Sequence, residues 1–157
     1  MIMVENKLRT ESELAYAAGI LDGEGTIGLG TSYNKYKERK YKRYRLQCRI
    51  VNTDARMVLW LREKFGGYMA IIPKSPPRME RYEWRLQDKK AASFLELVEP
   101  YSVIKKEQIK IALDFRSTID QRKGTKRRVP KDTNDIRDKM FNDLKTLHLR
   151  SDNKLKK

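Results

Sequence analysis

Two carboxylates flanked by glycines are the residues of this sequence best suited to carry out chemistry. They are Asp22 and Glu24, within the run Asp-Gly-Glu-Gly at residues 22–25. Carboxylate oxygens are the ligands that Mg²⁺ prefers, and such a cation neutralises charge on a phosphate and activates a bound water molecule. His148 is the one histidine and Cys48 the one cysteine of the chain, so the sequence indicates neither a histidine-based catalytic triad nor a cysteine-based zinc site.

These two acids lie at the end of a predicted helix. Thr10 and Glu13 form the T-x-x-E pattern of a capping box at its start. The helix has four larger apolar residues that are expected to face a core, namely Leu14, Tyr16, Ile20 and Leu21.

Small residues form a ridge along the same helix. They recur every four positions at Ala15, Gly19 and Gly23, with Ala18 and Asp22 beside them. Such a ridge lets another helix approach until the two backbones nearly touch. We therefore expect a symmetric contact between two copies of the chain that brings their acids together. The residues predicted for this contact are Ala15, Ala18, Gly19 and Asp22.

A strongly basic strand is the second feature with functional content. Over residues 41–51 the apolar and polar positions alternate, which predicts a strand with two different faces. One face has Tyr44, Leu46, Cys48 and Ile50, and the other has Arg43, Arg45, Gln47 and Arg49. An ordinary solvent-exposed face would also be polar. Three arginines and a glutamine without an acid favour DNA contact, because arginine reads guanine and glutamine reads adenine in the major groove.

Other segments extend this predicted DNA surface. The strand over residues 26–32 has Ser32 on its polar side, and the strand over 82–86 has Glu83 and Arg85 outward with Trp84 in the core. The dense basic segment 122–128 is either a solvated link or a phosphate-contacting loop, and the second interpretation is favoured. Its expected contacts are Lys123, Arg127 and Arg128.

Composition supports a polyanionic partner. The chain has 157 residues and a formal net charge of +15, enough length for one domain with its own core. The basic residues are spread over strands and loops rather than gathered on an amphipathic helix, which fits nucleic acid better than a membrane surface. Neither a bilayer-spanning apolar run nor an export signal is visible. The expected location is therefore intracellular, in a prokaryotic cytoplasm or nucleoid or in an organelle matrix.

Residues 17–25, Ala-Ala-Gly-Ile-Leu-Asp-Gly-Glu-Gly, resemble the nine-residue signature of the LAGLIDADG homing endonucleases. Thr26 and Ile27 continue this segment into a strand, as in that family. Ala17 replaces the first leucine of the motif, and Glu24 replaces the commoner metal-binding Asp while remaining a hard oxygen ligand. The predicted element order also matches the family from Thr10 to about Leu147.

The resemblance implies an α+β fold of αββαββα order, with curved antiparallel sheets as a DNA-binding saddle and additional C-terminal helices. We expect one domain over residues 1–157, with a loose N-terminal arm at 1–9 and a basic loop and C-terminal helix at 117–157. With its single motif, the chain resembles the homodimeric branch of the family, in which two signature helices pack along a two-fold axis.

The resemblance also implies roles for individual residues. Glu24 and the backbone carbonyl of Gly23 are expected to bind the metal, and Asp22 to cap or brace the paired helix ends. Asn52 and Arg56 correspond to groups that order the attacking water, and Lys105 to a lysine near the scissile phosphate. Each has an ordinary alternative, because Asn52 fits a turn, Arg56 a helix surface and Lys105 a solvated lysine.

The implied activity is a site-specific DNA endonuclease that acts as a homodimer on a long, nearly palindromic site. It would be encoded within an intron or intein, would use Mg²⁺, would cut across the minor groove and would leave 3′ overhangs. Ca²⁺ is expected to substitute without cleavage, and Mn²⁺ is an alternative metal.

Two other functions remain open from the sequence. An RNA maturase would help its intron to fold and would not need a protein metal site, so the intact Glu24 argues mildly against it. A non-catalytic DNA-binding regulator would keep the basic strand face and bind its operator without cleaving it.

Overall fold

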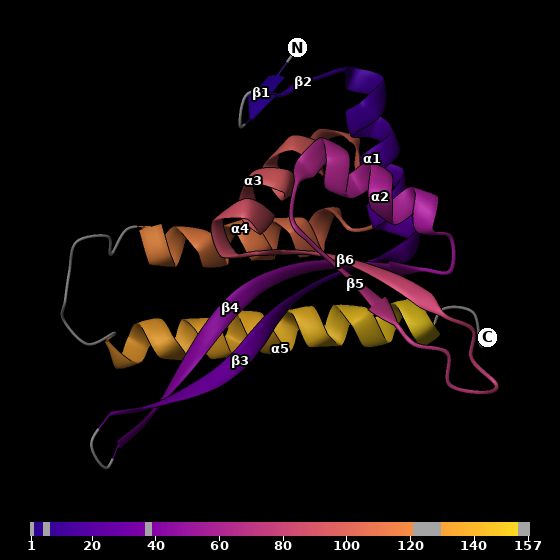
Figure 1. Ribbon diagram of the computed structural model, residues 1–157. Coiled ribbons are helices and arrows are strands. Elements are labelled where there is room, and N and C mark those ends of the chain that lie inside the picture. The colour runs from indigo at the N-terminus through magenta and orange to yellow at the C-terminus, as the bar shows by residue number, and fades with distance from the viewer. Residues whose placement is uncertain (1, 5–6, 37–38, 121–129, 154–157) are drawn as a thin grey trace.

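The computed structural model of the protein describes residues 2–4, 7–36, 39–120 and 130–153 (Figure 1). The helices are α1 (Glu11–Glu24), α2 (Ala55–Phe65), α3 (Asp88–Val98), α4 (Lys106–Asp120) and α5 (Lys131–Asn153), with a short 3-10 helix, η1 (Glu99–Tyr101). The strands are β1 (Ile2–Val4), β2 (Lys7–Arg9), β3 (Gly25–Tyr36), β4 (Arg39–Asn52), β5 (Tyr68–Ile72) and β6 (Arg81–Gln87). The architecture is α+β, and the order from α1 to α3 is αββαββα, as predicted.

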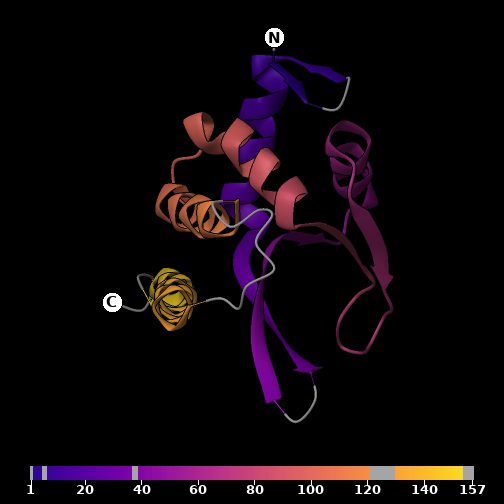
Figure 2. The same cartoon turned by 90° about the vertical axis from the view of Figure 1, so that its left-hand side faces the viewer.

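One antiparallel sheet contains β3, β4, β6 and β5 in that spatial order. β3 and β4 form a long hairpin whose register runs from Gly25 opposite Ile50 to Tyr36 opposite Arg39. Figure 2 shows α4 and α5 on one side of this hairpin, whereas its other side carries no helix of the described part of the chain. The sheet therefore has a covered face and an open face.

The covered face of the sheet supplies much of the hydrophobic core. Its buried residues on the two central strands are Tyr44, Leu46, Cys48, Ile50, Trp84 and Leu86. Trp84 is fully buried as predicted, and its indole nitrogen donates to the backbone oxygen of Gly66 at 2.7 Å. Burial of each large apolar side chain stabilises the fold by about 1.5–3 kcal/mol, so this alternation fixes which face of the sheet stays open.

α1 passes directly into β3, and local chemistry sets both of its ends. Thr10 accepts the backbone N–H of Glu13 at 3.2 Å, and Glu13 accepts the backbone N–H of Thr10 at 3.0 Å, which is the predicted capping box. At the other end, a Cβ on Gly25 would lie 2.6 Å from the backbone oxygen of Leu21. Glycine is therefore needed where the chain turns from helix into strand.

α5 packs against the β3–β4 hairpin and supports the part of it that extends beyond the central core. Phe141 of α5 lies with its ring centroid 5.7 Å from that of Tyr44. Asp138 of α5 accepts hydrogen bonds from the Tyr44 hydroxyl and from the Lys42 ammonium. The hairpin is thereby braced on its covered face and left accessible on the other.

The structure corrects three sequence-based expectations. The strands expected over residues 26–32 and 41–51 are longer than predicted, because β3 continues through Tyr36 and β4 begins at Arg39. The predicted loose arm instead contains the paired strands β1 and β2, and Arg9 is 4 % exposed. Tyr16 was expected in the core but is 55 % exposed. Its ring lies at the surface and packs edge-on against Trp60 of α2.

Among the described residues, no helix combines the length and apolarity that crossing a bilayer requires.

Candidate functional site

The ridge of small residues on α1 is exposed in the single chain. Ala15, Gly19 and Gly23 lie on the solvent-facing side of the helix. A Cβ added at Gly19 or Gly23 would meet no atom within 4 Å. Ala18, which was predicted to share this contact surface, is fully buried against its own chain. The surface that a second helix could reach therefore consists of Ala15, Gly19 and Gly23.

The open face of the sheet carries the predicted basic side chains. On β4 the residues between the buried positions are Arg43, Arg45, Gln47 and Arg49. Ser32 of β3 is directly opposite Arg43, and Arg85 of β6 is directly opposite Arg49, so both belong to the same face. The structure thus brings together the predicted residues Ser32, Arg43, Arg45, Gln47, Arg49 and Arg85.

The middle of β3 offers no side chain to this face, because Gly28 and Gly30 lie between Thr26 and Ser32. Gly28 and Gly30 are opposite Gln47 and Arg45. A Cβ on Gly30 would lie 2.8 Å from the side-chain nitrogen of Gln47, so the amide of Gln47 lies across the bare backbone. Gly30 therefore makes room for one long side chain of β4, that of Gln47.

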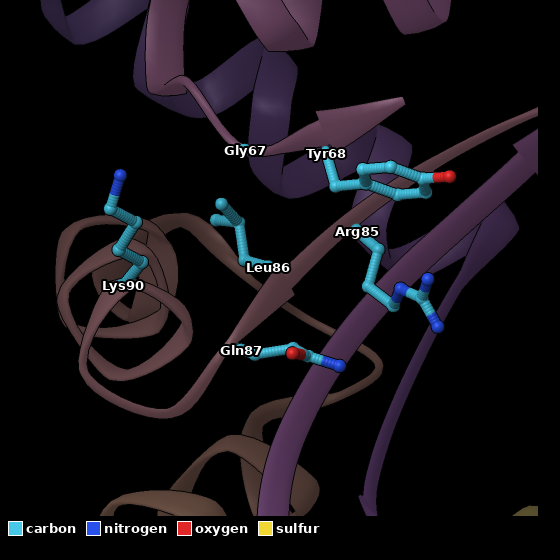
Figure 3. A pocket seen from close by; sticks show the side chains of 6 residues that line it. All are labelled: Gly67, Tyr68, Arg85, Leu86, Gln87 and Lys90. Carbon is cyan, nitrogen blue, oxygen red and sulfur yellow. The ribbon is translucent and has the colours of Figure 1, made fainter. Parts of the chain in front are cut away.

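A shallow pocket adjoins the basic face at β5 and β6. Its lining residues are Gly67, Tyr68, Arg85, Leu86, Gln87 and Lys90 (Figure 3). Figure 3 shows Arg85 and Gln87 directed to one side of β6 and Leu86 to the other. The Arg85 guanidinium carbon lies 5.2 Å from the ring centroid of Tyr68, a distance typical of a cation–π contact.

Glu83 is an acid within this basic face, and its spacing in the sequence predicted only that it points outward. Its side chain is only 9 % exposed, and one carboxylate oxygen accepts from Nε of Arg49 at 2.6 Å. The other oxygen lies 3.4 Å from Nε of Arg85. Arg45 has a looser ion pair, 3.5 Å from Asp88.

Glu24 lies at the C-terminal end of the exposed ridge. It is the last residue of α1, and its side chain is exposed. Among the described residues, the Glu24 carboxylate takes part in no hydrogen bond or ion pair. The position predicted to bind a metal is therefore accessible.

Asp22, predicted to brace the paired helix ends, is engaged within its own chain. Its carboxylate accepts from the hydroxyl of Ser102 at 2.6 Å and from the backbone N–H groups of Val103 at 2.7 Å, Ile104 at 3.1 Å and Lys105 at 3.0 Å. Burial raises the pKa of Asp22, but these four hydrogen bonds outweigh that effect and leave its pKa below the ordinary 3.8. Asp22 thus holds the segment between η1 and α4 of its own chain.

Lys105 is brought to the end of α1 by this contact. Its ammonium donates to the backbone oxygen of Asp22 at 2.6 Å. A cation is favoured here because the last carbonyls of a helix carry partial negative charge. Burial lowers the pKa of Lys105 below its usual 10.5, although the charges of Asp22 and Glu24 counteract that shift. The predicted catalytic residues Glu24 and Lys105 are therefore placed at the same end of α1.

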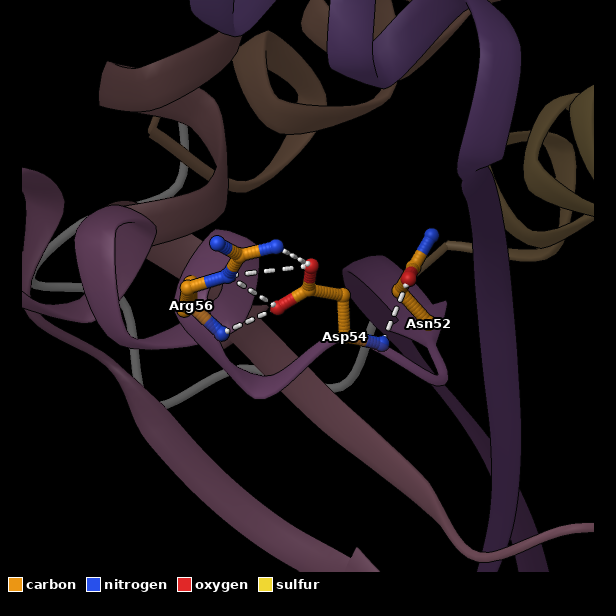
Figure 4. A network of polar contacts seen from close by, with 3 residues as sticks. All are labelled: Asn52, Asp54 and Arg56. Carbon is orange, nitrogen blue, oxygen red and sulfur yellow. Dashed lines mark hydrogen bonds and ion pairs between the residues drawn. The ribbon is translucent and has the colours of Figure 1, made fainter.

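Asn52 and Arg56 are linked through Asp54 (Figure 4). The side-chain oxygen of Asn52 accepts the backbone N–H of Asp54 at 2.7 Å. Arg56 makes an ion pair of 2.6 Å with Asp54, and these bonds lower the pKa of Asp54 to about 2. Because Gly25 is opposite Ile50 in the sheet, Asn52 lies beside the end of α1, at the same edge as Glu24.

The described residues of one chain do not form a ready-made metal site. Among the described residues, no group of three or more His, Cys, Asp or Glu side chains could hold a metal ion. The oxygen donors at the end of α1 fit Mg²⁺, which commonly uses one or two carboxylates together with water and substrate phosphates. Lys123, Arg127 and Arg128, predicted to contact phosphates, lie outside the described residues.

No protein-family model and no curated protein matches the sequence. Among solved structures, the homing endonuclease I-CvuI in complex with the I-CreI target is 16% identical, with a TM-score of 0.59 over 85% of this chain and 95% of I-CvuI.

Two further structures have the same fold. The archaeal intron-encoded homing endonuclease I-Vdi141I, complexed with DNA, is 13% identical, with a TM-score of 0.57 over 88% of this chain and 98% of that chain. The LAGLIDADG homing endonuclease I-SmaMI, bound to cleaved DNA, is 14% identical, with a TM-score of 0.57 over 93% of this chain but 45% of I-SmaMI. Together with the signature segment at residues 17–25, these likenesses confirm that the chain has the LAGLIDADG homing endonuclease fold.

Proposed function

We propose that this protein is a site-specific DNA endonuclease that acts as a homodimer and depends on a divalent metal ion. The observation that carries the proposal is the position of Glu24, which ends an exposed ridge on α1 and has Lys105 beside it. The open basic face of the sheet lies next to this end of the helix, since β3 begins at Gly25. The groups proposed to cleave DNA therefore lie beside the surface proposed to bind it.

Two copies of the chain would complete the site. The chain covers 95% of I-CvuI but only 45% of I-SmaMI, so it corresponds in extent to about half of the longer protein. Pairing of two exposed ridges would place the two Glu24 carboxylates together, one for each strand of a duplex. Pairing would also add the partner's Glu24 to a site at which the described residues of one chain form no cluster of three or more ligands.

Glu24 and the backbone oxygen of Gly23 are the groups that would hold Mg²⁺. Bound there, the metal would stabilise negative charge on the scissile phosphate and lower the pKa of a bound water molecule. I-CvuI was crystallised with DNA in the presence of Mg and of Ca, which supports divalent metal use in this fold.

The remaining residues have separate roles in this proposal. Lys105, whose ammonium is held at the end of α1, would stabilise charge on the scissile phosphate. Asn52 uses its side-chain oxygen within the chain, which leaves its amide nitrogen to donate to a water molecule. Arg56 is 90% exposed and would orient the same water from α2. The arginines of β4 would read base edges in the major groove.

The test is cleavage of the DNA obtained by joining the two sequences that flank the gene, cloned in a supercoiled plasmid. The wild-type protein should convert this plasmid to linear DNA with Mg²⁺ and should only bind it with Ca²⁺. The Glu24→Gln variant should bind the plasmid but leave it supercoiled. Binding without nicking by the wild-type protein would instead favour a regulator, and preference for the intron RNA would favour a maturase.

A further inference from the structure

Arg49 and Arg85 both lie against Glu83, and this arrangement suggests how the open face would recognise DNA. The inference rests on the proposed function. Arg49 and Arg85 occupy directly opposed positions on β4 and β6. Two like charges in such positions destabilise a sheet unless a counter-charge lies between them. Glu83 supplies this counter-charge from the neighbouring outward position of β6.

The contacts fix how each guanidinium is presented. Glu83 accepts from Nε of Arg49 at 2.6 Å and lies 3.4 Å from Nε of Arg85, each through a different oxygen. Within the described part of the chain, the terminal nitrogens of these two arginines make no hydrogen bond. Arg49 is 47% exposed and Arg85 34% exposed, whereas Glu83 is covered by both. The carboxylate therefore holds the inner edge of the Arg49 guanidinium by a hydrogen bond and that of Arg85 by a longer ion pair, and both side chains remain partly exposed.

The Tyr68 ring adds a second restraint on Arg85. It lies 5.2 Å from the guanidinium carbon, on the edge strand β5 directly opposite Arg85 (Figure 3). Arg85 is thus held from two sides, and Arg49 by the shorter bond to Glu83. Side chains restrained before binding lose less conformational entropy when they contact DNA.

We infer that Glu83 is a positioning residue that aligns Arg49 and Arg85 to recognise guanines in two neighbouring base pairs. The outer edge of each guanidinium has two N–H donors, and these match the two acceptors of guanine in the major groove. Side chains directly opposed in an antiparallel sheet are about 4.5–5.5 Å apart at Cβ, so the ends of two long arginines need to converge by only about 1–2 Å to match the rise of about 3.4 Å between base pairs. Glu83 itself acts through the arginines and does not need to contact a base.

The experiment uses the full chain with Ca²⁺ and a duplex library randomised over the length of the site, followed by sequencing of the bound fraction. The wild-type protein should select guanine in two adjacent base pairs of each half-site. Arg49→Ala should erase one of these preferences and Arg85→Ala the other. Glu83→Gln should weaken both by about five-fold or more, because each bidentate contact contributes at least that much discrimination.

Two readouts distinguish positioning from a merely structural role of Glu83. In Glu83→Gln, the base preferences at all other positions should stay as in the wild type, and affinity for random duplex should hold or rise because a negative charge is removed. Arg45→Ala, which removes an arginine paired with Asp88 instead, should change a different position. If Glu83→Gln keeps both guanine preferences, the inference is wrong although the endonuclease proposal stands.

If Glu83→Gln does not fold, Arg49→Lys and Arg85→Lys test the part of the inference that assigns two adjacent guanines to these arginines. Each keeps its charge but loses the forked geometry, so each should erase one of two adjacent guanines. Effects at separated positions would overturn the inference. If the wild-type protein selects no duplex at all, the proposed function fails, and the inference fails with it.

Discussion

Lys105 is tied to Asp22 at two points. Its ammonium donates to the backbone oxygen of Asp22 at 2.6 Å, and its backbone N–H donates to the Asp22 carboxylate at 3.0 Å. The segment before α4 is therefore fixed to the end of the helix that carries Glu24. This relationship places two proposed catalytic residues, Glu24 and Lys105, at the same end of α1 although they are far apart in the sequence.

Asp22→Asn should destabilise the protein and displace Lys105. The Asn side chain has one oxygen where the carboxylate had two, and its amide would face the N–H donors of Val103 and Ile104. We expect a loss of about 1–3 kcal/mol in the free energy of unfolding, the range for hydrogen bonds to a charged group. Urea titration measures this loss. The exposed Asp143→Asn on α5 serves as control and should change stability by less than about 0.5 kcal/mol.

The contribution of Asp22 to stability should depend on pH. Its pKa is lowered in the folded chain, because the four hydrogen bonds outweigh the opposing effect of burial. The folded state therefore favours the ionised form, and the gain is complete above the ordinary pKa of 3.8 and is lost as the pH falls through the lowered value. The stability difference between the wild type and Asp22→Asn should shrink as the pH is lowered from 6 to below 4. A difference that grows in acid would refute this assignment.

Lys105→Met should slow cleavage while leaving binding intact. The substitution keeps most of the side-chain volume and removes the ammonium that is held at the end of α1. We expect a fall in the cleavage rate of about a hundred-fold or more, as for loss of one group that stabilises a transition state. Affinity for the site in Ca²⁺ should change by less than about three-fold. Lys106→Met, at an exposed neighbouring position, should cut at the wild-type rate, and an equal defect in both variants would remove Lys105 from the site.

Gly19→Leu should yield a folded chain that does not pair. A side chain at this position meets no atom within 4 Å in the single chain, and leucine favours helix over glycine by somewhat less than 1 kcal/mol. The new side chain would, however, hold a second α1 away from the ridge. Sedimentation velocity should therefore find a folded monomer that lacks cleavage activity. Lys110→Leu on the exposed side of α4 is the control, and a dimeric Gly19→Leu would exclude this ridge as the interface.

Much of the fold follows from hydrophobic spacing in the sequence. Alternation over residues 41–51 predicted both the strand and its basic face, and the buried Leu46 and exposed Arg49 confirm that interpretation. The capping box at Thr10 predicted the start of α1. The extension of β3 to Tyr36 and of β4 back to Arg39 was not predicted. Residues 33–40 lack the apolar alternation that marks a strand packed on a core.

The partners of polar residues could not be derived in the same way. Asp22 was expected at the contact between two helices because it lies beside the ridge, but its carboxylate bonds to residues about 80 positions away. Ala18 was assigned to the same contact, but α1 is oriented so that Ala18 faces the core and is completely buried. Glu83 was predicted only to point outward, since nothing in its own strand shows that two arginines converge on it.

The central claim is that two chains each supply one Glu24 to cut one strand of the same duplex, and a mixed dimer tests it most directly. Wild-type and Glu24→Gln chains with different tags are co-expressed, and the mixed dimer is purified through both tags. With Mg²⁺ and a supercoiled plasmid that carries the joined flanking site, this dimer should stop at the nicked circle, whereas the wild-type dimer gives linear DNA. A mixed dimer that linearises the plasmid as fast as the wild type, or two tags that never purify together, would contradict the account.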